Sequence, residues 1–300
     1  MSPANEVRKS KAERTAEARE NARKIREAQL AKDKRNRLLI GWGIVVAVVA
    51  VLAAIALVVT TTMRDEAQRN APIADQGPVP TNANVNGGVT LLANTEVAKT
   101  DPATVNIADI PAAPATPPTE VKAPGADAEA GKPVKVVVYI DFICPVCKRF
   151  EDTYGAELTK LRNEGKITLE YRPLGFLDNK STTNYSSRAA NAAACVVNES
   201  PEKYADFLNT LFEKQPKEGG SGLSDNELKK LATEAGAKNI DSCVDNKTFR
   251  PYVKYSTQAA AATGVSGTPT AFVDGKQWGT GDSANIDFIP FVQTAIDAKG

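Results

Sequence analysis

The stretch that decides the fold reads "DFICPVCKRF" (residues 141–150), in which Cys144 and Cys147 are separated only by Pro145 and Val146. The chain has 300 residues, four cysteines and no histidine. Three interpretations of this pair compete: a metal clip, an inert structural bridge, and a redox pair that forms and opens disulfides. The surrounding sequence decides among them.

A buried strand precedes the pair and an amphipathic helix follows it. "VKVVVYIDF" (134–142) is β-branched and apolar, as in a buried strand of a parallel or mixed sheet. Apolar residues at three- and four-residue spacing in 144–165 predict a helix ending near Gly165, with Pro145 in its first turn. "KITLEYRPL" (166–174) is a second predicted strand, which completes a βαβ unit.

The remainder of the chain predicts a helical block and a ββα end. The apolar spacing is helical from about 179 to 262. "TAFVDGKQW" (270–278) predicts a hairpin with Asp274 and Gly275 at its turn, and a last helix is expected near 286–298. The predicted fold class is therefore α/β, with one helical subdomain inserted into a sheet-containing domain that spans 133–300.

One segment is apolar enough to cross a membrane. Residues 38–60, "LLIGWGIVVAVVAVLAAIALVVT", carry no charge and span roughly 34 Å as a helix, against a hydrocarbon core of about 30 Å. A cleaved signal peptide would have a shorter apolar region with a small-x-small site after it, whereas Ala54-Ile55-Ala56 lies inside the run. The sequence predicts a single uncleaved transmembrane helix in the lipid bilayer.

The charges that flank this segment predict its orientation. Residues 1–37 contain twelve Lys and Arg against six Asp and Glu, a net +6, so the other 263 residues sum to −5. The positive-inside rule places 1–37 in the cytoplasm, as a solvated charged helix, and residues 61–300 outside the cell membrane. Four cysteines suit an oxidising compartment, and a mildly acidic body predicts no nucleic-acid partner.

The region 61–132 is rich in Pro, Ala, Thr and Asn. Within it, "PAAPATPPTEVKAPG" (111–125) contains five prolines, which exclude a regular helix. We therefore expect an extended extracytoplasmic linker that lets the domain stand off the membrane. "GVTLLA" (88–93) is apolar enough to add an edge strand to the domain.

The position of Cys144 at a helix start favours redox chemistry. Unpaired N–H groups and the positive end of the helix dipole stabilise a thiolate there, and Lys148 and Arg149 add positive charge. Cys147, about one turn further on, can attack a mixed disulfide formed at Cys144. A zinc site would need histidines or a second close pair of ligands, so we predict a redox pair and no metal site.

The other two cysteines lie in the predicted helical block. Cys195 is on an Ala-rich apolar helix face, and Cys243 lies in "NIDSCVDN" (239–246). They form either a structural disulfide or two buried free thiols, and neither has a catalytic setting.

Two motifs and the block between them carry a resemblance to a known family. "YIDFICPVC" (139–147), the helical insertion and "GVSGTPTAFVDG" (264–275) resemble exported thioredoxin-fold proteins of the DsbA/DsbG-like group, in the membrane-anchored form found in actinobacteria. The resemblance covers about 132–300. It implies a thioredoxin fold with an inserted helical subdomain, behind a transmembrane helix and a Pro/Ala-rich tether.

The resemblance also implies roles for residues outside the cysteine pair. Pro269 would be a cis-proline lying against the cysteines, and the backbone of Thr268 would pair with an extended substrate strand. A second disulfide in actinobacterial relatives supports pairing Cys195 with Cys243. Asp141, three residues before Cys144, either assists proton transfer to Cys147 or caps the helix start.

Two positions depart from the family pattern. Val146 stands where some members carry His, and Val138 stands where some carry a buried acid. Because one source of thiolate stabilisation is absent, we expect a milder oxidant than the strongest members.

The function implied is a membrane-anchored thiol–disulfide oxidoreductase that donates disulfides to unfolded exported proteins. It would need no bound cofactor beyond its own Cys144–Cys147 disulfide and would be reoxidised by a quinone-linked membrane protein. We expect a monomer, since the linker lacks the dedicated domain of dimeric isomerases. The alternatives are a disulfide reductase or isomerase of the same fold, and a non-catalytic peptide-binding or chaperone module.

Overall fold

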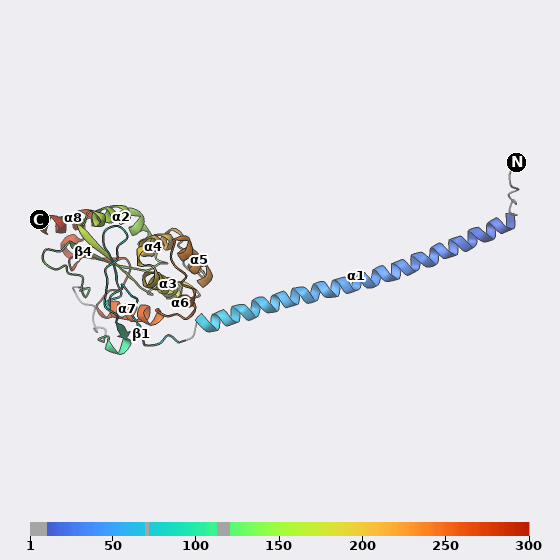
Figure 1. Ribbon diagram of the computed structural model, residues 1–300, viewed down its shortest axis with the longest axis horizontal. Helices are drawn as coiled ribbons and strands as arrows, with labels where there is room; N and C mark the ends of the chain where they lie inside the picture. Colours follow the sequence, from blue (N-terminus) through green and yellow to red (C-terminus); the bar gives the residue numbers. More distant parts are fainter. Residues whose placement is uncertain (1–10, 70–71, 113–120, 300) are drawn as a thin grey trace. The chain divides into compact units, whose positions relative to one another are not determined.

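The computed structural model describes residues 11–69, 72–112 and 121–299, and it divides into two units, Met1–Asn70 and Ala71–Gly300 (Figure 1). The first unit consists of one helix, α1 (Lys11–Arg69). Within the described residues, α1 is the one helix long and apolar enough to cross a membrane, with a mean hydropathy of 3.0 over its most apolar window. Apolar side chains such as Leu39 and Trp42 are exposed along it, as a lipid-facing helix requires.

Helix α1 also corrects one boundary. Residues 61–69 were expected to begin the extended linker, but they continue the helix to Arg69. The segment "TTMRDEAQR" contains neither proline nor glycine, so nothing in the sequence stops the helix after the apolar run.

The second unit is built on a five-stranded mixed sheet of order β2-β5-β4-β6-β7. β4 (Val134–Ile140) pairs in parallel with β5 (Ile167–Pro173) and antiparallel with β6 (Thr270–Val273). β7 (Lys276–Gln277) follows β6 across the predicted turn at Asp274 and Gly275, both with positive φ. The predicted thioredoxin fold is confirmed.

Helices cover both faces of this sheet. Val136, Val138 and Ile140 of β4 point into the core shared with α2 (Pro145–Asn163) and α8 (Phe288–Lys299). Val137 and Tyr139 point to the other face, where they pack with Ala260 of α7 (Arg250–Ala262). The alternation of the pleat thus explains why the whole strand is apolar: it is buried on both sides.

The helical block lies where the sequence predicts it. It comprises α3 (Tyr185–Glu199), α4 (Tyr204–Glu213), α5 (Asp225–Glu234), α6 (Asp241–Asp245) and α7, with short 3₁₀ turns at Asp178–Lys180 and Pro201–Lys203. Cys195 in α3 and Cys243 in α6 form a disulfide, so the alternative of two free thiols is wrong.

The expected linker is largely part of the folded unit, which is a second correction. β1 (Gln76–Pro78) and β3 (Thr104–Asn106) form a small antiparallel sheet, and a 3₁₀ turn follows β3 at Ile107–Asp109. Elsewhere in the unit, a last 3₁₀ turn (Gly281–Ser283) follows β7. β2 (Val89–Leu91) is the expected edge strand of 88–93 and pairs with β5.

The described residues between 72 and 132 are anchored by a few apolar side chains. Val79, Ala83 and Val105 are buried in the main core. Proline prevents helices here but does not prevent extended segments from packing against the domain. The proline-rich composition therefore gave no indication that this region packs into the core. The domain therefore begins near residue 72 rather than 133. The prolines at 114, 117 and 118 lie outside the described residues.

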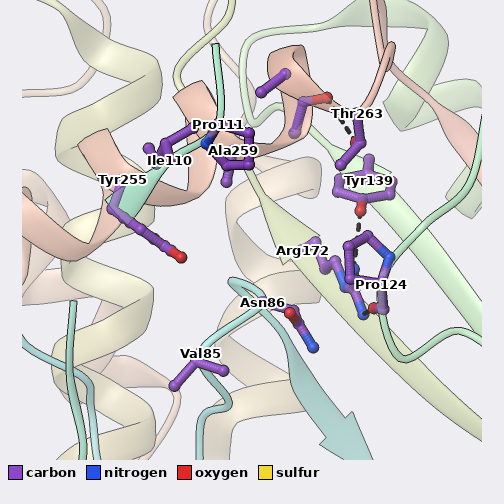
Figure 2. Close-up of a pocket in the computed structure, with 12 residues that line it drawn as sticks. Val85, Asn86, Ile110, Pro111, Pro124, Tyr139, Arg172, Tyr255, Ala259 and Thr263 are labelled. Carbon is purple, nitrogen blue, oxygen red and sulfur yellow. Dashed lines mark hydrogen bonds between the residues drawn. The ribbon is translucent and has the colours of Figure 1, made fainter. Parts of the chain in front are cut away.

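A buried ion pair holds the segment around Pro124 against the sheet. Arg172 is fully buried and donates from Nε to Glu170 at 2.7 Å, from Nη1 to the Tyr139 hydroxyl at 2.8 Å and from Nη2 to the Pro124 carbonyl at 2.8 Å. Arg172, Tyr139 and Pro124 line a cavity of about 180 Å³. Figure 2 shows them with Tyr255 on the opposite side. A buried guanidinium needs these partners to offset its desolvation.

The Cys195–Cys243 disulfide should stabilise the domain without serving its redox chemistry. Replacing both residues with Ala removes a cross-link between positions 48 apart, which the chain-entropy account values at roughly 4 kcal/mol. Guanidinium unfolding should show a lower midpoint, while the reduction potential of the other pair stays unchanged. An unchanged midpoint would contradict a stabilising role.

Candidate active site

The sheet brings the two predicted motifs together. β4 ends at Ile140, and the following turn is closed by the Cys144 N–H donating to the Asp141 carbonyl at 3.0 Å. Because β6 runs antiparallel to β4 with Thr270 opposite Tyr139, the residues just before β6 reach this turn. The Cys144 thiol donates to the Thr268 carbonyl at 3.3 Å. The Thr268–Pro269 peptide bond is cis, as expected.

Cys144 is the N-cap residue of α2 and is nearly buried, with 5% of its surface exposed. Its pKa is lowered to about 6, first by a hydrogen bond from the Cys147 side chain and then by N–H groups at the start of α2 and by the side chain of Thr268. These donors outweigh the opposing effect of burial. Cys144 therefore carries a thiolate at neutral pH when it is reduced.

Cys147 is shifted in the opposite direction. It is fully buried, and burial raises its pKa, reinforced by its hydrogen bond to Cys144 and by the charge there. The Asp141 N–H donates to its sulfur at 3.5 Å. Both cysteines are free thiols in this structure. The pair thus consists of one stabilised thiolate and one thiol held in its protonated form.

Asp141 is fully buried, and its carboxylate accepts hydrogen bonds from the N–H groups of Ile143, at 3.1 Å, and Leu177, at 2.9 Å. No side chain caps α2, so of the two sequence alternatives for Asp141 the helix cap is wrong. Burial raises its pKa to about 6. The carboxyl titrates near neutral pH, and the backbone N–H of the same residue contacts the Cys147 sulfur, so proton transfer to Cys147 stays a prediction for Asp141.

The charged residues after the pair contribute less than expected. Lys148 forms an ion pair with Asp152 at 2.9 Å, one turn further along α2, so its charge is largely neutralised locally. Val146 is 48% exposed between the two cysteines. The Cys147 side chain, followed by the N–H groups of the helix start, carries the thiolate stabilisation, rather than the flanking lysine and arginine.

Sequence reasoning missed Gln215, which follows α4 in the helical block. Its Nε2 donates to the carbonyls of Phe142, at 3.1 Å, and Cys144, at 3.0 Å. It thereby fixes both ends of the short loop that presents the cysteine. No local motif marks this glutamine, because its partners lie more than seventy residues earlier in the chain.

The described residues contain no cluster of three or more His, Cys, Asp or Glu side chains able to hold a metal ion. The chemistry that the site itself offers is thiol exchange.

The low pKa of Cys144 gives a direct titration. The reduced protein should show a thiolate absorbance step near pH 6 that disappears in Cys144→Ser. Because the folded pKa lies below the unfolded value of ~8.5, this group stabilises the reduced fold above that value and loses the contribution as pH falls toward 6. A first thiolate step near the unfolded value would refute the assignment.

Loss of Gln215 should loosen the cysteine loop. Gln215→Ala leaves two carbonyls without their side-chain donor, at a cost of roughly 1–3 kcal/mol in urea unfolding, and should raise the Cys144 pKa. Lys214→Ala, at the exposed neighbouring position, is the matched control. Equal pKa values in the wild type and Gln215→Ala would show that the glutamine does not position the loop.

Comparison with known proteins agrees with this architecture. Residues 128–287 match the family described as Thioredoxin. The serine/threonine-protein kinase PknE of Mycobacterium tuberculosis is 32% identical over 147 residues, which cover 46% of this chain and 26% of that protein. Disulfide bond formation protein D of Bacillus subtilis is 27% identical over 148 residues, covering 48% and 64%. The chain spans only about a quarter of the kinase's length.

Solved structures of M. tuberculosis proteins are also similar. Reduced DsbA shares 29% identity, with 61% of this chain and 98% of that chain covered and a TM-score of 0.46. Reduced DsbG shares 31% identity, with 60% and 91% covered and a TM-score of 0.48. Since the family match spans more than half of the 300 residues and agrees with the sheet order, the chain belongs to the thioredoxin family.

Proposed function

We propose that this protein is an extracytoplasmic thiol–disulfide oxidoreductase that introduces disulfides into exported polypeptides. The observation that carries the proposal is the opposite shift of the two thiol pKa values beside the Thr268 carbonyl. A stabilised thiolate on Cys144 makes it a good leaving group, so the Cys144–Cys147 disulfide is readily reduced.

The proposed reaction balances as a two-electron exchange. A substrate thiolate attacks the Cys144 sulfur of the protein disulfide, and the bond to Cys147 breaks. Cys147 takes a proton, for which the Asp141 carboxyl is the nearby source. A second substrate thiolate then attacks the substrate sulfur of the mixed disulfide and releases Cys144 as a thiolate. The substrate dithiol is oxidised to a disulfide, and the protein disulfide is reduced.

The raised pKa of Cys147 favours this direction. A buried, protonated Cys147 has little thiolate with which to attack the mixed disulfide and return the substrate unoxidised. The second thiol of the substrate therefore has time to react. The backbone at Thr268 and Pro269 is the proposed ledge on which the substrate lies extended beside Cys144.

The proposed setting is the outer face of the cell membrane. Helix α1 would anchor a monomeric protein in the bilayer, with 1–37 in the cytoplasm and the domain outside, as the basic flank predicts. No cofactor is proposed beyond the cysteine pair. Reoxidation is assigned to a quinone-linked membrane protein that accepts two electrons per cycle.

The reduction potential of Cys144–Cys147, equilibrated with glutathione in the full chain in detergent, tests the direction of the reaction. A value of roughly −120 to −180 mV supports disulfide donation, and about −270 mV would favour the alternative of a reductase. A second assay measures the rate at which the oxidised protein forms disulfides in a reduced model protein. Wild type should be active and Cys144→Ser with Cys147→Ser inactive, whereas activity in that variant would support a non-catalytic peptide-binding module.

A further inference from the structure

A cleft of about 580 Å³ lies between α2 and α4, with β2 and β5 at its floor. Its walls combine apolar side chains, such as Leu91 and Leu208, with five carboxylates and a single arginine. This volume falls within the range of natural ligand pockets. The cleft is separate from the cysteines but adjoins their loop: Phe212 lines it and packs against Phe142, with the rings tilted and their centroids 5.4 Å apart.

The rim of the cleft is acidic and unneutralised. Glu202, Asp206 and Glu213 are exposed at the rim, and none forms an ion pair with any described residue. Asp152 is paired with Lys148. Three free carboxylates at one opening attract a positively charged group and disfavour a negatively charged one.

Two residues that line the cleft each have a buried polar atom without a hydrogen-bond partner among the described residues. These atoms distinguish one end of the cleft from the other. Glu151 accepts a hydrogen bond from the Tyr171 hydroxyl at Oε2, 2.8 Å away, while its buried Oε1 has none. Arg162, only 4% exposed, donates from Nη1 to the Leu92 carbonyl, but its buried Nε is unused. A buried polar group without a partner costs free energy. We therefore expect a ligand that offers a hydrogen-bond donor to Glu151 at one end of the cleft and an acceptor to Arg162 at the other.

We infer that this cleft receives a lysine or arginine side chain of the polypeptide substrate, with Glu151 accepting from the cation and Arg162 donating to a carbonyl of the same segment. The inference rests on the proposed function and names its substrate class. A metal ion fits less well, because the described residues form no metal-holding cluster. The aliphatic part of a lysine or arginine side chain would contact the apolar walls of the cleft, and its charged end would reach the Glu151 carboxylate.

Dimensions along α2 set the expected spacing. Glu151 lies seven residues after Cys144, roughly 10 Å along the helix, which an extended peptide covers in about three residues. Arg162 lies eleven residues beyond Glu151, roughly 16 Å, or about five extended residues. The preferred substrate therefore carries a basic residue about three or four positions from its reacting cysteine.

The test uses the oxidised full chain in detergent and three reduced two-cysteine peptides that differ at one position, four residues from a cysteine: Lys, Gln or Glu. We expect the Lys peptide to be oxidised about tenfold faster than the Gln peptide, and the Glu peptide slowest, with the differences shrinking at high salt. Glu151→Gln and Asp206→Asn should each reduce the Lys/Gln ratio. Glu157→Gln, on α2 but outside the cleft, should leave both the Lys/Gln ratio and the Gln-peptide rate unchanged.

The outcomes separate the inference from the proposed function. If all three peptides are oxidised at one rate, or if the cleft variants leave the Lys/Gln ratio unchanged, the cleft inference is wrong and disulfide donation stands. If no peptide is oxidised, the proposed function fails. Binding of serine-substituted Lys and Gln peptides then decides the cleft alone: equal affinities overturn it, and a preference for Lys lost in Asp206→Asn supports it. Asp206 is exposed, so its substitution by Asn leaves the packing of the core intact.

Discussion

The antiparallel pairing of β4 with β6 is the constraint on which the site depends. It joins segments more than 120 residues apart, and its register places the Thr268 carbonyl within 3.3 Å of the Cys144 sulfur. A slip of one residue would turn each side chain of β6 to the other face of the sheet, and two different cores make that slip costly. The energy that fixes the redox geometry is therefore mostly the burial of apolar side chains far from the sulfurs.

Within this fold, the two thiols of the cysteine pair differ in their surroundings and therefore in their protonation. Cys144, at the N-terminal end of α2, receives a hydrogen bond from the Cys147 side chain and then from backbone N–H groups, which favour its anion, while Cys147, one turn inside, is desolvated and stays neutral. The carboxyl of Asp141 is buried, as Cys147 is, but it accepts hydrogen bonds from two backbone N–H groups, and it titrates near neutral pH. Burial and backbone donors within the seven residues 141–147 therefore assign these three groups their protonation.

Local patterns predicted the parts of the molecule whose partners are close in sequence. The apolar run before Cys144, the helix after it and the Asp274-Gly275 turn each form where the sequence indicates. The misplaced start of the domain had another cause. Proline-rich segments between 72 and 132 pack through a few side chains on distant elements, and Gln215 reaches the cysteine loop from another subdomain. Such contacts depend on the assembled fold, so no spacing or motif reveals them in advance.

The disulfide between α3 and α6 has a consequence for the maturation of the protein itself. Cys195 is fully buried, so its bond must be made before or during the collapse of the helical block. The four cysteines can be joined in consecutive pairs along the chain, Cys144 with Cys147 and Cys195 with Cys243. An oxidant that links cysteines in chain order would reach this pairing without any reshuffling. Completing the fold of this protein therefore involves the same conversion of thiols to a disulfide that its own cysteine pair can exchange.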